Sequence, residues 1–364
     1  MRSQVMGGMN YYIEVQFADG VNWLARIRRC NATSAPPELR NYILRSEIAT
    51  LQWLSRTNIP VPKVFDFNLD ESNPVGVAYI LMEKVPGHSV GNSLCLASSL
   101  EQRKKVLSQL ADIYVELLAH PLDAMGSLDD PISSHIGPFA RESLTDFQAG
   151  AMKPMAPCSS NEEFFTARIQ LILDLILRQE IYTTRPVDAF LIHRFLLDAV
   201  SRVFSNHDLD DGKFYLRHAD DKGDHIFVDD EFNITGIIDW EWAFTTPKSS
   251  AFNSLIGLLP VKDFYEGIND IGEGEIVFAE ILEQSGHKDL GSIVRNGRLG
   301  HRFQFCCGYE LSDWDGFLGL FGGLLKCLGD EKDFNWETWE AKALAKYRDD
   351  DRLQELLRRS CSPK

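Results

Sequence analysis

Three pieces of one stretch say most about the fold: His218-Ala219-Asp220, then His225-Ile226-Phe227-Val228-Asp229, and then Ile237-Ile238-Asp239-Trp240-Glu241. Two short apolar runs, at residues 226–228 and 234–238, flank a polar turn at residues 229–233. Apolar runs on either side of such a turn predict a β-hairpin. The hairpin would follow a loop that carries Asp220, and Asp239 would come directly after its second strand.

The spacing of these two carboxylates suits phosphoryl transfer. That reaction needs one carboxylate to orient the attacking hydroxyl and a second, about twenty residues on, to hold Mg²⁺ on the nucleotide phosphates. Asp220 and Asp239 supply both groups at kinase-like spacing. The sequence therefore predicts Asp220 as the catalytic residue and Asp239 as the metal ligand.

Composition places the chain among globular proteins and limits its partners. A chain of 364 residues suits two lobes or two domains. Its 44% hydrophobic and 25% charged residues are ordinary for a folded protein. The net charge of −16 argues against a nucleic-acid partner, because binding to phosphate backbones is driven by basic patches. The same charge is compatible with a cationic small-molecule substrate.

We expect a cytoplasmic protein that does not bind a membrane. The first eight residues lack the apolar core of a secretory signal, and no apolar run approaches the roughly eighteen residues of a membrane span. The seven cysteines are scattered, odd in number and without a Cys-x-x-Cys pair. They read as reduced thiols rather than as disulfides or zinc ligands.

The composition changes near residues 83–88, where Pro86-Gly87 breaks the chain. The segments before the break read as one helix at residues 38–55 and four strands, at residues 11–17, 23–27, 64–67 and 77–82. The segments after it read as helices at residues 100–118, 162–180 and 187–204, a loop-like stretch at 129–160 and a mostly helical tail from about 260 to 358. We expect an α+β fold with a small antiparallel β-rich lobe (residues 1–84) and a large, mainly helical lobe (residues 85–364) that carries the catalytic-loop hairpin at 214–241.

Phosphoryl transfer also needs a cation near the phosphates and a carboxylate that holds it. Arg26 lies on the strand after the Asp19-Gly20 turn, and Glu47 on the next helix is its natural partner. A plain surface ion pair, worth ~0–1 kcal/mol, is the alternative. Gly7 and Gly8, just before the first strand, would let backbone amides approach phosphates, although a flexible amino terminus explains them equally well.

The order of these elements resembles the aminoglycoside phosphotransferase family, whose members have a protein-kinase-like fold, and in particular its branch common in filamentous fungi. Each matching motif is weak alone, but their order is specific and covers nearly the whole chain. The motifs are Gly7-Gly8-Met9-Asn10, Asp19-Gly20-x-x-Trp23-x-x-Arg26-Ile27, Glu47, Pro60-x-Pro62-x-Val64, Leu81-Met82-Glu83-x-x-Pro86-Gly87, His218-x-Asp220, Ile237-Ile238-Asp239-Trp240-Glu241 and Trp336-x-x-Trp339 with Tyr347.

The resemblance implies ATP-dependent transfer of the γ-phosphate to a hydroxyl of a small molecule, with Mg²⁺ as the metal. It places Arg26 and Glu47 at the phosphates. It makes Met82, Glu83 and Lys84 the hinge whose backbone receives adenine. The family also has a helix ahead of the glycine pair, which this chain is expected to lack because it begins almost at the loop.

Two positions depart from the family pattern. Ala219 stands where the family has glycine, and His225 stands where it has the asparagine that ligates the second metal. Imidazole nitrogen suits Mn²⁺ better than Mg²⁺. His225 is therefore a candidate ligand for Mn²⁺, unless the second metal is absent, the loop no longer does this chemistry, or His225 simply opens a strand beside a carboxylate. Two alternative functions stay open: a kinase-fold pseudoenzyme or binding protein without phosphotransfer, and a repurposed biosynthetic enzyme.

Overall fold

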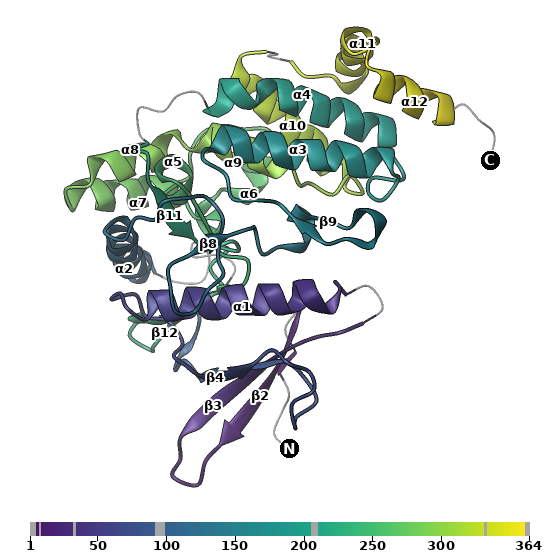
Figure 1. Cartoon of the computed structure of the whole chain (residues 1–364). Coiled ribbons are helices and arrows are strands. Elements are labelled where there is room, and N and C mark those ends of the chain that lie inside the picture. Colours follow the sequence, from purple (N-terminus) through teal and green to yellow (C-terminus); the bar gives the residue numbers. More distant parts are fainter. Residues whose placement is uncertain are drawn as a thin grey trace.

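An antiparallel sheet with one helix packed on it forms the amino-terminal part of the chain in the computed structural model, which describes residues 5–6, 9–31, 34–91, 99–204, 210–330 and 333–360 (Figure 1). Its strands follow the order β1-β2-β3-β5-β4. They are β1 (Val5–Met6), β2 (Asn10–Gln16), β3 (Asn22–Arg28), β4 (Val64–Asn68) and β5 (Tyr79–Glu83). Helix α1 (Pro37–Leu54) begins with a proline, which suits the first helical turn. In Figure 1 it lies between the sheet and the helical part.

A second sheet joins the end of the amino-terminal part to the predicted hairpin. Strands β12 (Ile226–Val228) and β13 (Ile234–Ile237) form the hairpin, and β6 (His88–Ser89) pairs with β12. Gly87 makes this close approach possible. It has a φ of +95°, and a side chain there would collide with the backbone carbonyl of Val228.

The remainder is mainly helical. The longest helices are α2 (Leu100–Leu118), α3 (Asn161–Leu177), α4 (Pro186–Phe204), α7 (Glu273–Gln284), α10 (Trp314–Leu328) and α11 (Trp336–Lys346). The shorter ones are α5 (Lys248–Ala251), α6 (Val261–Tyr265), α8 (Lys288–Asn296), α9 (Arg298–Cys306), α12 (Asp351–Ser360) and the 3-10 turns η1 (Glu142–Leu144), η2 (Gln148–Gly150) and η3 (Ile256–Leu258). Small strand pairs complete it: β7 (Ser127–Leu128) with β8 (Ile136–Gly137), β9 (Thr145–Asp146) with β10 (Lys153–Pro154), and β11 (Phe214–Arg217) with β14 (Phe244–Pro247).

The helical part has its own aromatic core between α3, α4, α9 and α10, which Figure 1 shows stacked against one another. Phe190, Phe303 and Phe321 are completely buried in it. This packing holds the segments around β11 and β14 that carry the predicted catalytic loop.

A small antiparallel sheet followed by a helical part confirms the predicted α+β class, and the helix predicted at residues 100–118 has those bounds. The stretch predicted as a loop at residues 129–160 contains three of the short strands and two 3-10 turns. No helix among the described residues is long and apolar enough to cross a membrane. The division of the chain after residue 84 stays a prediction.

Candidate functional site

The loop after β11 presents Asp220 to solvent and fixes its neighbours. The backbone N–H of Asp220 donates to His218 Nδ1 (3.2 Å), so the ring proton lies on Nε2, which donates to the carbonyl of Ile238 (2.9 Å). This imidazole ties the loop to the segment just before Asp239. The Asp220 carboxylate is 38% exposed, whereas Asp221 is buried. Of the two adjacent carboxylates, only Asp220 is placed to meet a substrate.

Asp221 has a structural position instead. One of its oxygens lies 3.3 Å from Arg217 Nη2, and the other accepts the backbone N–H of Ile256 (3.1 Å). These contacts bind the loop to the helical part.

Lys222 was not predicted as a site residue, yet its ammonium lies 2.8 Å from Asp220 Oδ1. The hydrogen bond to Asp220 raises the pKa of Lys222, and the charges of Asp220, Asp224 and Asp239 add to this rise. A single lysine two residues after Asp220 is the only signal of it in the sequence. It partly offsets the negative charge that these aspartates concentrate in the loop.

His225, the candidate metal ligand, is buried. Its ring stacks on that of His218, with 4.1 Å between centroids and 24° between planes, and its Nδ1 accepts the backbone N–H of Gly223 (3.4 Å). Burial lowers the pKa of His225 well below its ordinary value, and the nearby His218 and Lys222 add to this. The imidazole is therefore neutral. Its role as a ligand stays a prediction.

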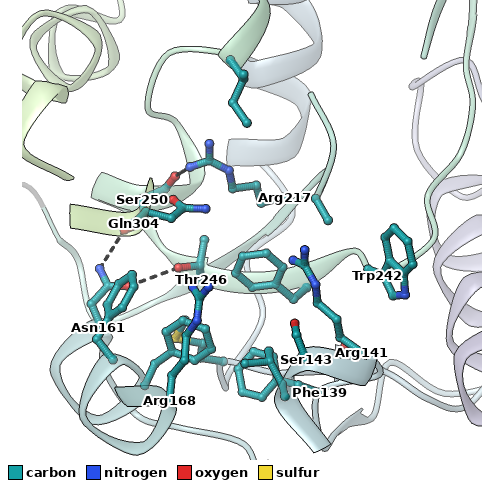
Figure 2. Close-up of a pocket in the computed structure, with 18 residues that line it drawn as sticks. Phe139, Arg141, Ser143, Asn161, Arg168, Arg217, Trp242, Thr246, Ser250 and Gln304 are labelled. Atoms are coloured by element: carbon teal, nitrogen blue, oxygen red, sulfur yellow. Dashed lines mark hydrogen bonds between the residues drawn. The ribbon is translucent and has the colours of Figure 1, made fainter. Parts of the chain in front are cut away.

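A small cavity lies next to the same loop, beside Ala219 (Figure 2). Its walls come from α3, β11, β14 and the segment around η1, and they include the three arginines Arg141, Arg168 and Arg217. No local pattern groups these residues, because they come from separate elements.

Arg26 is the centre of a buried ion-pair cluster. The β3 register places it opposite Tyr12 on β2 and Ile80 on β5, and its side chain is 1% exposed. Its Nη1 lies 2.8 Å from Glu47 Oε1 and 3.0 Å from Asp239 Oδ1. The predicted Arg26–Glu47 pair is thus formed and is buried, not a surface pair. The same guanidinium also joins the sheet and α1 to the segment after the hairpin.

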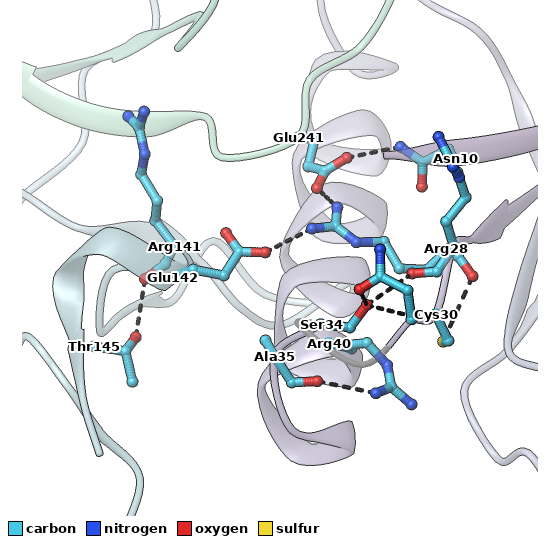
Figure 3. A network of polar contacts seen from close by, with 12 residues as sticks. Asn10, Arg28, Cys30, Ser34, Ala35, Arg40, Arg141, Glu142, Thr145 and Glu241 are labelled. Carbon is cyan, nitrogen blue, oxygen red and sulfur yellow. Dashed lines mark hydrogen bonds and ion pairs between the residues drawn. The ribbon is translucent and has the colours of Figure 1, made fainter. Parts of the chain in front are cut away.

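Glu241 completes this cluster, although the sequence motif that contains it gave it no role. It is 4% exposed and accepts hydrogen bonds from Asn10 Nδ2 (2.9 Å) and Arg26 Nη2 (2.5 Å). It also pairs with Arg28, which reaches Glu142 on the other side (2.5 Å) (Figure 3). Its place two residues after Asp239 is the signal that could have found it.

The cluster holds more acid than base. Two guanidinium groups, of Arg26 and Arg28, face the four carboxylates of Glu47, Glu142, Asp239 and Glu241. Burial raises the pKa of Glu47 to about 7, against the opposing effect of Arg26, and the charge of Asp239 adds to the rise. An excess of two negative charges therefore lies around Asp239 when all four acids are ionised.

Asp239 is the exposed member of the cluster. Its side chain is 47% exposed, and its backbone has a φ of +61°, a left-handed conformation that is strained for a residue with a side chain. The next residue, Trp240, is buried and donates its indole N–H to the carbonyl of Ile237 (3.0 Å). This anchor holds the turn so that one oxygen of Asp239 meets Arg26 while the carboxylate remains open to solvent.

The predicted hinge runs beside the Arg26 strand. Met82 is buried and pairs with Leu24, and Glu83 pairs with Trp23. Lys84 is exposed, and its ammonium lies 3.0 Å from Glu14 on β2. Gly7 and Gly8, the predicted phosphate-contacting glycines, lie outside the described residues. The adenine and phosphate roles of these five residues stay predictions.

Comparison with known proteins supplies the family. Residues 20–247 match the model of the APH family, described as the phosphotransferase enzyme family. A solved structure of a candidate fructosamine-3-kinase from Thermobifida fusca YX-ER1 is similar in fold, with a TM-score of 0.53 at 14% identity over 89% of this chain and 93% of the other.

Two fungal relatives match shorter stretches. A subtelomeric hrmA-associated cluster protein of Aspergillus fumigatus is 33% identical over 123 residues, which are 34% of this chain and 23% of that protein. Altered inheritance of mitochondria protein 9 of Saccharomyces cerevisiae is 31% identical over 94 residues, 24% of this chain and 15% of that protein. The chain thus spans less than a quarter of these relatives' length.

The family match covers well over half of the chain and includes both the Arg26 cluster and the Asp220 loop. It confirms the predicted protein-kinase-like fold of the aminoglycoside phosphotransferase type. The chain belongs to the phosphotransferase enzyme family.

Proposed function

We propose that this chain transfers the γ-phosphate of ATP to a hydroxyl of a small molecule. One observation carries the proposal. The buried Arg26 guanidinium bridges Glu47 and the exposed Asp239, while His218 ties the Asp220 loop to the same segment. A cation for phosphates, a carboxylate for metal and a carboxylate for the acceptor are thereby held together, and phosphoryl transfer depends on such positioning.

Each group has a distinct role. Asp220 accepts a hydrogen bond from the acceptor hydroxyl and orients it toward the phosphorus. Arg26, held by Glu47, positions the phosphates. Lys222, hydrogen-bonded to Asp220, offsets the negative charge between the acceptor loop and the triphosphate. The backbone of Met82, Glu83 and Lys84 receives the adenine, and Gly7 and Gly8 cover the phosphates.

The donor set of the site fits Mg²⁺. Asp239 offers a half-exposed carboxylate, and the cluster to which it belongs has two excess negative charges when all four of its acids are ionised. Proteins usually hold Mg²⁺ by one or two carboxylates together with substrate phosphates and water. Within the described ranges, no three His, Cys, Asp or Glu side chains are grouped so that they could hold a metal by themselves. Asp239 would hold the ion, which when bound neutralises charge on the transferred phosphoryl group. His225 would join it if the ion is Mn²⁺.

The test is ADP release from ATP and Mg²⁺ by the purified chain with a panel of hydroxyl compounds: sugars, amino sugars, amino alcohols and hydroxy acids. Asp220→Asn should lower turnover by ~10²–10⁴-fold, the usual contribution of such a group. Asp230→Asn, the same substitution in the exposed turn between β12 and β13, should leave it unchanged. A wild-type protein that releases no more ADP than Asp220→Asn would favour a binding protein without transfer. A cytoplasmic location, where ATP is supplied, is part of the same proposal.

A further inference from the structure

The cavity beside Ala219 has a strongly one-sided charge. Its lining contains Arg141, Arg168 and Arg217, and no aspartate or glutamate. Figure 2 shows Arg141 and Arg168 reaching into one space from the segments around η1 and α3, with Arg217 from β11 on the other side. Four phenylalanine rings and one tryptophan ring also line the cavity, and charges beside such apolar walls are less screened than charges in bulk water.

Only one of the three arginines has its charge balanced by a neighbour. Arg217 lies 3.3 Å from Asp221 and also donates to the carbonyl of Ser250. Within the described part of the chain, the guanidinium groups of Arg141 and Arg168 have no carboxylate within ion-pair distance and no hydrogen-bond acceptor. The Arg141 guanidinium lies over the ring of Trp242, 5.6 Å from its centroid.

The charge of Arg168 also acts on Arg141. Burial lowers the pKa of Arg141, and the charge of Arg168 lowers it further, while Glu142 and Asp220 act in the opposite direction. Both side chains are partly buried, and two cations that share a small cavity without an anion are destabilising, because charges with little access to water need partners. An anion bound between them would remove this repulsion, and planar guanidinium groups bind oxyanions through paired hydrogen bonds.

We infer that the acceptor carries a compact oxyanion, a carboxylate or a phosphate, which binds between Arg141 and Arg168 while its hydroxyl reaches Asp220. This inference rests on the proposed function. The link to the reaction is direct in the chain, because Ala219, on the cavity wall, precedes Asp220. The acceptor is therefore an anionic molecule such as a hydroxy acid, rather than the cationic one that the net charge of −16 allowed. Local charge decides here, because salt screens distant surface charges beyond about 8–10 Å.

The size of the cavity agrees with a compact group. Its volume is about 40 Å³, and a single water needs roughly 10–15 Å³ by this measure, so an oxyanion fits and a sugar ring does not. A wider cavity of about 470 Å³ adjoins it and shares Arg141, Ser143 and Trp242. The remainder of the acceptor has room there.

The test measures anion binding without nucleotide. Thermal unfolding of the full chain is followed with sodium acetate and with sodium phosphate, against sodium chloride at equal ionic strength, neutral acetamide and cationic ethanolamine. Acetate or phosphate should raise Tm in a saturable way. The anion that saturates at the lower concentration indicates whether the cavity prefers a carboxylate or a phosphate. Acetamide and ethanolamine should have no such effect.

Matched variants locate the site. Arg168→Gln should weaken anion binding at least tenfold, and so should Arg141→Gln, which tests the same cavity if the first variant does not fold. Arg168→Lys keeps the charge and should retain part of the binding. Arg202→Gln, at an exposed arginine paired with Asp330 (2.9 Å), should bind like the wild type.

Two results would overturn the inference: acetate and phosphate act no differently from chloride, or Arg168→Gln and Arg141→Gln bind them as the wild type does. Failure of the proposed function gives a different result. A protein that binds anions in this cavity but never consumes ATP would refute phosphoryl transfer and leave the anion site standing.

Discussion

Glu241 should be among the most important side chains for stability, because it joins the amino-terminal sheet to the segment after the hairpin. It receives hydrogen bonds or ion pairs from Asn10, Arg26 and Arg28 while almost fully buried. Removing one partner of a buried ion pair usually costs about 3–5 kcal/mol. In Glu241→Ala, Arg26 keeps its partners Glu47 and Asp239, and the repulsion among the four carboxylates is reduced. The loss in the free energy of unfolding should therefore lie near the lower end of this range, at about 3 kcal/mol.

Glu241→Gln separates charge from shape. It keeps an oxygen acceptor and the volume of the side chain but removes the charge. It should lower the free energy of unfolding by about 1–2 kcal/mol, because hydrogen bonds to a charged group become weaker neutral ones. Urea is the denaturant of choice, because guanidinium chloride would screen the ion pairs. Unfolding should be followed by tryptophan fluorescence and circular dichroism, whose coincidence checks that the transition is two-state.

A double-mutant cycle with Arg28→Met tests the cause. Glu241→Gln and Arg28→Met each remove one charge of the same ion pair, so their effects on the free energy of unfolding should fall short of additivity by about 1–2 kcal/mol. Glu355→Gln, which breaks an exposed pair with Arg359 on α12, is the control and should cost less than about 0.5 kcal/mol. Additive effects of Glu241→Gln and Arg28→Met, or a Glu241→Ala variant as stable as the control, would refute the account of this cluster.

Two further predictions concern histidines. If His225 ligates the metal, ADP release should be faster with Mn²⁺ than with Mg²⁺, and His225→Asn should reverse that preference. Equal activity of the wild type and His225→Asn with Mg²⁺ would exclude His225 from the metal site. Burial lowers the pKa of His193 to about 4 from 6.5, so below pH 6.5 the unfolded chain takes up a proton that the folded chain does not. The stability that neutral His193 contributes is therefore fully present above pH 6.5, and about 3 kcal/mol of it should be lost as the pH drops to 4. His193→Gln should lose less over that range in urea unfolding, and an unchanged pH dependence would contradict this.

Local patterns predicted the elements well. The helix at residues 100–118 was predictable because apolar positions recur at helical spacing, and Ser99 and Gln102 cap its start. The Arg26–Glu47 pair was predictable because a strand and the next helix pack together. Its burial was not, since that depends on Glu241, which is 215 positions away from Arg26 in the chain.

Long-range packing explains what the sequence did not reveal. The cavity arginines come from three separate segments, one of them in the stretch at residues 129–160 that has no periodicity to place it. The position of His225 in the loop was predictable, but the direction of its ring was not. The ring stacks on His218 because β11 and β12 bring the two histidines together. Side-chain direction at the end of a loop is set by tertiary contacts, and these have no local signature.

Calorimetric titration of the chain with ATP and Mg²⁺ tests most directly whether the Asp239–Arg26 cluster is a nucleotide site. The wild type should bind saturably, Asp239→Ala should bind at least tenfold more weakly, and Asp230→Ala, in the exposed hairpin turn, should match the wild type. Binding of equal affinity in Asp239→Ala, or no binding by the wild type, would contradict the account.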